Sequence, residues 1–149
     1  AQDEEDRPRC AGAGGGMSKT YKGSCHCGAV RFEANIELAQ GTFRCNCSIC
    51  FKTRAWLAPV PADAFRLLSG EDSLRDYQFG KKRIHHRFCT QCGVRPFSQG
   101  KDAQGKDTYA VRVNCLDGAD PGELIGAPVK YFNMLHDDFK SAPAETRHL

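Results

Sequence analysis

The sequence reads Cys25-His-Cys27-Gly near its start and Cys89-Thr-Gln-Cys92-Gly in its second half. In an extended segment, side chains two residues apart point to the same face, so Cys25 and Cys27 can direct both sulfurs at one ion. A C-x-x-C turn brings Cys89 and Cys92 together, and two such pairs complete the four-sulfur tetrahedron of a structural zinc site. Sixty-one residues lie between the two pairs, far more than in a local zinc ribbon. The spacing therefore predicts a zinc ion that joins the start of the domain to its second half and contributes to folding.

A third group of cysteines lies between these pairs, in the segment Cys45-Asn-Cys47-Ser-Ile-Cys50. Three sulfurs within one short turn can bind one face of a zinc ion. Structural zinc almost always has four protein ligands, whereas catalytic zinc keeps one position open. The triplet therefore predicts a catalytic zinc site.

Other interpretations of the cysteines remain open at this stage. Cys115, His85 or His86 could supply a fourth ligand to the triplet and close it. A thioredoxin-like role for Cys89 and Cys92 would need a βαβ pattern, which the sequence lacks.

Composition limits the class of protein. The chain of 149 residues is long enough for one domain with a real core. Apolar residues make up 40%, and no apolar run approaches the roughly 20 residues that cross a bilayer, so we expect a soluble globular protein. The net charge of +3 does not by itself favour a nucleic-acid partner. Nine cysteines without a signal peptide argue against a disulfide framework and for metal binding in a reducing cytoplasm.

The first sixteen residues differ from the rest of the chain. They are charged and then rich in Gly and Ala, without apolar periodicity, and Met17 begins a segment that reads like a natural start. We expect residues 1–16 to be a flexible leader, a remnant of cloning or an upstream translation, and residues 17–149 to form a single domain. Cys10 lies in this leader and is not expected to bind metal.

Short alternating segments separated by turn signals predict a mainly β protein without long amphipathic helices. The clearest strand spans Thr108–Asn114, where Tyr109, Val111 and Val113 would share one face. Short helical turns are expected near residues 48–54 and 61–64. The other predicted strands are Ala29–Ala34, Ala55–Val60, Phe65–Leu68, Leu74–Phe79, Ile84–Phe88 and Val129–Phe132.

The cysteine motifs together resemble the glutathione-dependent formaldehyde-activating enzyme family, which also includes centromere protein V. The resemblance is carried by Gly23–Phe32 with its C-x-C pair, by the C-x-C-x-x-C triplet, and by Phe88–Phe97 with its C-x-x-C-G turn. It implies a β-tent fold of several small antiparallel sheets with two zinc ions. It implies structural zinc at Cys25, Cys27, Cys89 and Cys92, and catalytic zinc at Cys45, Cys47 and Cys50.

The resemblance also implies a reaction, that of an S-(hydroxymethyl)glutathione synthase, which is a carbon–sulfur lyase acting on glutathione and formaldehyde. Three thiolates make zinc a weak Lewis acid, so the open position is better suited to a thiol than to hydroxide. A thiolate held there can add to an aldehyde to form a hemithioacetal, or the same carbon–sulfur bond can break.

A non-catalytic, zinc-stabilised binding module is the alternative, with the basic cluster Lys81-Lys82-Arg83 as its contact surface. Basic residues near the cysteines could bind a substrate carboxylate or simply form a solvated face; these are Lys52, Arg54, Arg83, Arg87 and Arg95.

Overall fold

The computed structural model describes residues 18–149, so the predicted leader with Cys10 lies outside the described residues. The strands are β1 (Lys19–Ser24), β2 (Arg31–Ile36), β3 (Thr42–Cys45), β4 (Leu57–Pro61), β5 (Phe65–Ser69), β6 (Leu74–Tyr77), β7 (His85–Cys89), β8 (Phe97–Lys101), β9 (Asp107–Arg112), β10 (Leu116–Asp117) and β11 (Val129–Phe132). The α-helices are α1 (Ser48–Thr53) and α2 (Pro121–Gly126), and short 3-10 turns span Leu38–Gln40, Ala62–Ala64, Glu71–Ser73, Val113–Cys115 and Met134–His136.

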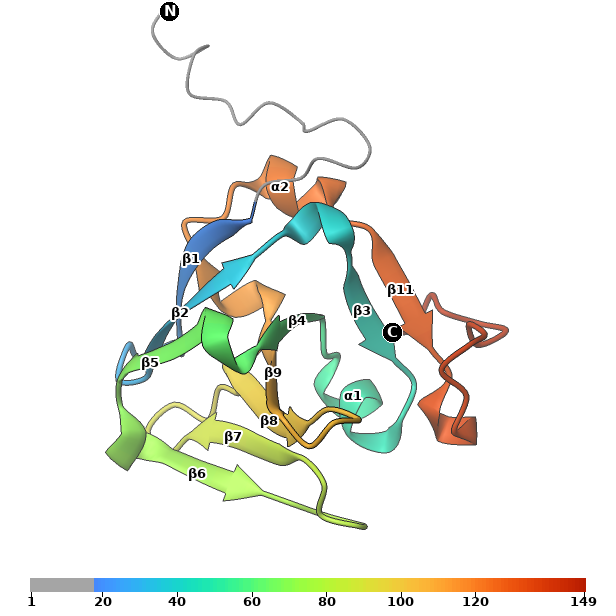
Figure 1. Cartoon of the computed structure of the whole chain (residues 1–149), viewed down its shortest axis with the longest axis horizontal. Coiled ribbons are helices and arrows are strands. Elements are labelled where there is room, and N and C mark those ends of the chain that lie inside the picture. Colours follow the sequence, from blue (N-terminus) through green and yellow to red (C-terminus); the bar gives the residue numbers. More distant parts are fainter. Residues whose placement is uncertain (1–17) are drawn as a thin grey trace, which may run out of the picture.

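These strands form two sheets (Figure 1). The smaller has four strands in the order β10-β1-β2-β5, and the larger has seven in the order β11-β3-β4-β9-β8-β7-β6. Neighbouring strands are antiparallel except β3 and β11, which run parallel. Both helices have only six residues, and no helix in residues 18–149 reaches the length and apolar character that a membrane span requires.

The predicted fold class, mainly β, is confirmed, and every predicted strand overlaps an observed one. Two short helices form where helical turns were expected, at Ser48–Thr53 and Ala62–Ala64. The strand predicted to reach Asn114 ends earlier, because the chain turns into a 3-10 helix at Val113. β1, β3, β8 and the two-residue β10 were not predicted. β3 has only four residues, and its two buried residues stand at its ends. Its buried positions therefore do not follow the alternation that is typical of a half-buried strand.

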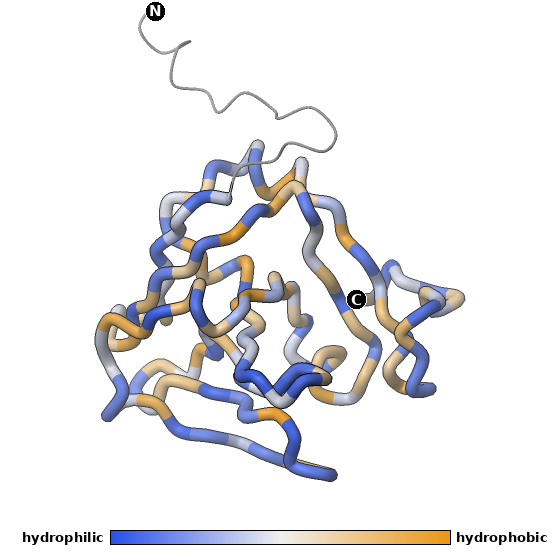
Figure 2. Tube along the Cα trace, in the orientation of Figure 1, coloured by the Kyte–Doolittle hydropathy of each residue, from blue (hydrophilic) through white to orange (hydrophobic). Residues whose placement is uncertain are grey.

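The core lies between the two sheets, and a cluster of aromatic rings packs there among aliphatic side chains. Phe32 of β2 is fully buried, and its ring stacks on Phe65 of β5 with 5.5 Å between centroids. Phe65 in turn packs on Phe97 at 4.8 Å and on Tyr109 at 4.0 Å, both from the larger sheet. Hydrophobic and hydrophilic positions alternate along many of the strands (Figure 2), as expected for sheets with one buried face. The aromatic cluster thus joins the sheets from inside.

Gly70, at the turn between β5 and β6, is required by the fold and gives a stability prediction. Its φ is +90°, and a Cβ there would lie 2.2 Å from the carbonyl oxygen of Ala29 and 2.7 Å from the Cα of buried Val30. Because both obstacles are backbone atoms, Gly70→Ala should lower the free energy of unfolding by about 2–4 kcal/mol, measured by urea denaturation. Gly105→Ala is the control, since φ is also positive there but nothing lies within 4 Å of the added carbon. Equal losses in the two variants would contradict the steric argument.

Candidate functional site

The first cysteine group lies where the two sheets meet. Cys25 follows β1 of the smaller sheet, and Cys89 ends β7 of the larger one. Each begins a tight turn of the same kind: the N–H of Cys25 donates to the carbonyl of Val30 at 3.0 Å, and the N–H of Cys89 donates to that of Val94 at 2.9 Å. Each turn contains a glycine with positive φ, which leaves the backbone free to curl around the sulfurs.

The sulfurs of this group have the spacing of a metal site. The Sγ atoms of Cys25, Cys27, Cys89 and Cys92 all lie within 4.8 Å of one another. The Sγ of Cys27 is 3.6 Å from that of Cys25 and 3.6 Å from that of Cys89. Tetrahedral zinc with bonds of about 2.3 Å would place its sulfurs roughly 3.8 Å apart. Four sulfurs at nearly that distance fit a zinc ion without rearrangement of the chain.

The second group lies at the junction of β3 and α1. Cys45 ends β3, Cys47 occupies the N-cap position of α1, and Cys50 lies in the first turn of the helix. Their three Sγ atoms also lie within 4.8 Å of one another. The N–H of Cys47 donates to the Sγ of Cys45 at 3.3 Å, so the backbone already favours negative charge on sulfur here. The triplet is therefore a second group that could hold a metal ion.

Hydrogen bonds at both ends of α1 hold the triplet in place. Asn46 donates through Nδ2 to Oδ1 of Asn133 at 2.7 Å and accepts the N–H of Leu135 at 3.0 Å, which ties the triplet to the end of β11. At the other end of α1, Arg112 of β9 donates to the hydroxyl of Thr53 at 3.0 Å. The three sulfurs thus stand on a helix that is fixed to two strands of the larger sheet.

The three sulfurs of the triplet shift one another's pKa. The pKa of Cys47 is lowered to about 2 because its sulfur accepts hydrogen bonds from the thiols of Cys45 and Cys50. The same contacts raise the pKa of Cys50. The three sulfurs are therefore so close that a negative charge on one disfavours a negative charge on the others. A divalent cation would remove that repulsion, so the donor set fits zinc.

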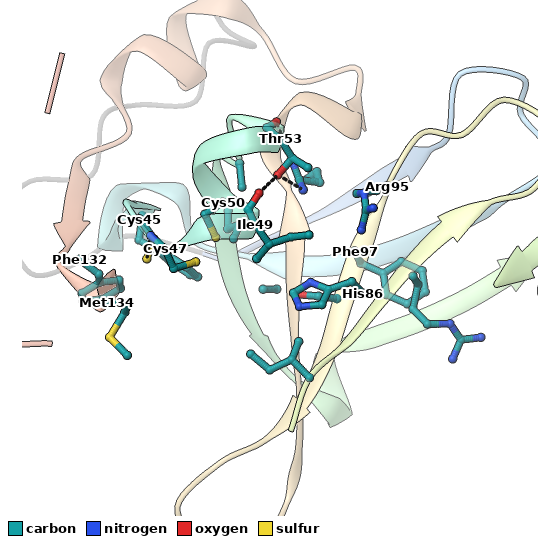
Figure 3. Close-up of a pocket in the computed structure, with 18 of the residues that line it drawn as sticks. Cys45, Cys47, Ile49, Cys50, Thr53, His86, Arg95, Phe97, Phe132 and Met134 are labelled. Carbon is teal, nitrogen blue, oxygen red and sulfur yellow. Dashed lines mark hydrogen bonds between the residues drawn. The ribbon is translucent and has the colours of Figure 1, made fainter. Parts of the chain in front are cut away.

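The triplet opens onto a cavity of about 410 Å³, whereas the four-cysteine group does not line it. Figure 3 shows Cys45 and Cys47 on one side of this cavity and His86 and Arg95 on the other. Much of the wall is apolar and includes Phe79, Phe132 and Phe139. Its other polar members, besides the cysteines, are Thr53, His86, Arg87, Arg95, Ser98 and Arg112. The size and the few polar groups match a small-molecule site.

None of the three candidates for a fourth ligand, Cys115, His85 and His86, belongs to the sulfur group of the triplet. Cys115 belongs to neither sulfur group; its thiol contacts the carbonyl of Arg95 at 3.9 Å, and burial raises its pKa to about 11. His85 pairs with Asp76 at 2.5 Å. His86 lines the cavity but is not part of the sulfur group. Within residues 18–149, then, no fourth His, Cys, Asp or Glu joins the triplet.

Of the five basic residues that the sequence suggested as substrate-binding, two line the cavity and three do not. Arg87 and Arg95 line the cavity, whereas Lys52, Arg54 and Arg83 are exposed and do not.

Arg112 and Thr53 are cavity residues that sequence reasoning missed. Arg112 is an arginine inside the clearest predicted strand, between two valines, and this contrast was the available signal. Burial lowers the pKa of Arg112, and the thiols of Cys50 and Cys115 oppose that shift. Arg112 and the three cysteines line the same cavity, so the guanidinium can balance thiolate charge there.

Comparisons with known proteins agree with this arrangement. Residues 20–131 match the family described as glutathione-dependent formaldehyde-activating enzyme. A crystal structure of a Rhodobacter sphaeroides protein is similar at 33% sequence identity with a TM-score of 0.62, covering 73% of this chain and 99% of that one. The family match spans well over half of the sequence, including every cysteine of both sulfur groups. The chain therefore belongs to the glutathione-dependent formaldehyde-activating enzyme family.

Proposed function

We propose that this protein is a zinc-dependent carbon–sulfur lyase that joins a small thiol to an aldehyde and cleaves the resulting hemithioacetal, in the manner of an S-(hydroxymethyl)glutathione synthase. The observation that carries the proposal is the exposure of the Cys45, Cys47 and Cys50 sulfurs to the cavity, with no fourth protein ligand among the described residues. Membership of a family named for glutathione and formaldehyde supports these compounds as the substrate class.

In this proposal the two sulfur groups hold one zinc ion each and have different roles. Cys25, Cys27, Cys89 and Cys92 would hold a structural ion, because four sulfurs complete its coordination. Cys45, Cys47 and Cys50 would hold a catalytic ion from one side only. When bound there, zinc would accept the thiol substrate and lower its pKa, which makes the sulfur nucleophilic at neutral pH.

The cavity residues would then control the substrate and its proton. The apolar wall excludes water from the reacting atoms. His86 faces the cavity, and burial lowers the pKa of its imidazole, so the neutral ring is favoured at pH 7. A neutral imidazole can take the proton that the thiol releases and return it to the aldehyde oxygen. Arg112, held by Thr53, would offset the negative charge of the thiolates.

Cobalt substitution tests the open position directly. We expect the Co²⁺-loaded protein to bind two metal ions per chain and to show the visible bands of tetrahedral thiolate sites. Adding glutathione should change the bands of one ion, because the thiol enters the open position beside the triplet. The other ion should be unaffected, since four sulfurs already surround it, and it serves as an internal control. A spectrum that no small thiol alters would contradict the proposed function.

The same proposal places the protein in a reducing compartment such as the cytoplasm. All eight described cysteines are free thiols, and seven of them lie in the two groups. Such groups bind metal only while reduced.

A further inference from the structure

The cavity beside the triplet carries positive charge that no Asp or Glu of the described residues neutralises. Arg87, Arg95 and Arg112 all line it. In residues 18–149, the ion pairs are made by other side chains, and no Asp or Glu lines this cavity. The thiolates of the triplet can offset the charge of Arg112, but Arg95 on the opposite wall has no carboxylate partner. A partly desolvated cation without a counter-charge is costly, so this wall favours an anion.

Arg95 is the arginine best placed to bind that anion. Its Nη1 is buried without a hydrogen-bond partner in the described part of the chain. Its guanidinium lies over the rings of Tyr77 and Phe88, 5.9 and 5.8 Å from their centroids. Stacking of this kind orients the guanidinium plane and leaves its N–H edge available for bidentate binding. Arg112, by contrast, already donates to Thr53.

Arg95 and the cysteine triplet lie on opposite sides of the cavity. Arg95 comes from the segment before β8 and faces Cys45 and Cys47 across the cavity (Figure 3). After burial, the charge of Arg95 does most to lower the pKa of His86, and Arg112 acts in the same direction, whereas Cys47 and Asp76 raise it. Arg95 and Arg112 thus form a positive wall beside the neutral imidazole. A single small molecule can therefore present sulfur to one wall and an anion to the other.

We propose that Arg95 is the residue of this cavity that binds a carboxylate of the thiol substrate. The thiol half of this inference rests on the proposed function, whereas the contact between Arg95 and a carboxylate does not. A planar carboxylate matches the guanidinium edge with two parallel hydrogen bonds.

The same wall disfavours an ammonium group beside the carboxylate that Arg95 binds. Without an acidic lining residue, an α-ammonium would lose water and gain no partner, beside two arginines that repel it. N-acetylcysteine should therefore bind more tightly than cysteine, since the two differ by acylation of the amine.

The test measures binding to the zinc-loaded full chain by isothermal titration calorimetry. The ligands are 3-mercaptopropionate and 3-mercaptopropanol, which share the thiol and the carbon chain but differ in the charged end. The wild-type protein should prefer the carboxylate by roughly tenfold or more, as expected for charge-assisted hydrogen bonds. Arg95→Gln should bring the ratio of the two dissociation constants close to one, and Arg95→Lys should restore part of it. Arg54→Gln, at an exposed arginine outside the cavity, should leave the ratio unchanged.

The outcomes separate this inference from the proposed function. A preference that persists in Arg95→Gln would overturn the Arg95 contact, as would no binding of 3-mercaptopropionate or equal affinity for both thiols in the wild type. Equal affinity accompanied by altered cobalt bands would leave the proposed function standing without the arginine contact. An Arg95-dependent preference without any change in the cobalt bands would support the carboxylate contact and contradict the proposed function. The Arg95→Lys variant keeps the test decisive should Arg95→Gln fail to fold.

Discussion

Replacement of Cys89 by serine should abolish cooperative folding, which is the largest effect expected of a single substitution in this protein. Cys89 is fully buried, and its sulfur belongs to the group that joins β1 of one sheet to β7 of the other. Structural zinc contributes apparent binding free energies of about 10–16 kcal/mol in small zinc domains. That is comparable with the whole stability of a domain, about 5–15 kcal/mol. Loss of one sulfur therefore removes a stabilising contribution that the aromatic core does not replace.

The measurements are thermal unfolding followed by near-ultraviolet circular dichroism, together with zinc content per chain. Cys115→Ser is the matched control, because Cys115 is also partly buried but belongs to neither sulfur group. It should keep two zinc ions and a cooperative transition. A Cys89→Ser protein with a native spectrum and two bound zinc ions would refute a structural role for this group.

The two sulfur groups could be predicted from the sequence because their geometry is local. Cys25 and Cys27 are two residues apart, and Cys89 and Cys92 lie in one turn, so backbone geometry alone brings each pair together. Because Cys45, Cys47 and Cys50 form a group of three by themselves, these two pairs remained to complete a tetrahedron, which made their long-range contact predictable. The observed sulfur separation of 3.6 Å between Cys27 and Cys89 agrees with this prediction.

The cavity could not be predicted in the same way, because its walls come from segments with no local signal. Arg112 reaches the triplet only because β9 pairs with β4 next to β3, and Arg95 faces it only because β8 and β7 follow in the same sheet. The parallel pairing of β3 with β11 brings Phe132 and Met134 to the cavity. Such contacts depend on strand order, and spacing along the chain does not determine strand order.

Replacement of Cys47 by serine should affect activity rather than folding, unlike replacement of Cys89. We expect the Cys47→Ser protein to stay folded but to lose one zinc ion and its activity. Cys47 is only half-buried and occupies the N-cap of α1, with an extended backbone at φ −60° and ψ 161°. Serine is among the best N-cap residues, so the substitution should leave α1 intact or stabilise it by up to about 1 kcal/mol. The loss at this site is then confined to metal binding, because two sulfurs hold zinc much less well than three.

The catalysed exchange between thiol, formaldehyde and their adduct, followed by NMR, should accordingly fall by about 10²-fold or more in Cys47→Ser. Zinc content should drop from two ions per chain to one while the melting temperature is retained. Cys115→Ser again provides the control, with both metal content and exchange rate unchanged. If Cys47→Ser kept its exchange rate after losing one ion, the remaining four-sulfur group would have to carry the reaction, although it does not line the cavity. A folded, inactive variant with one zinc ion would instead locate the chemistry at the triplet, because folding and catalysis would then depend on different sulfurs.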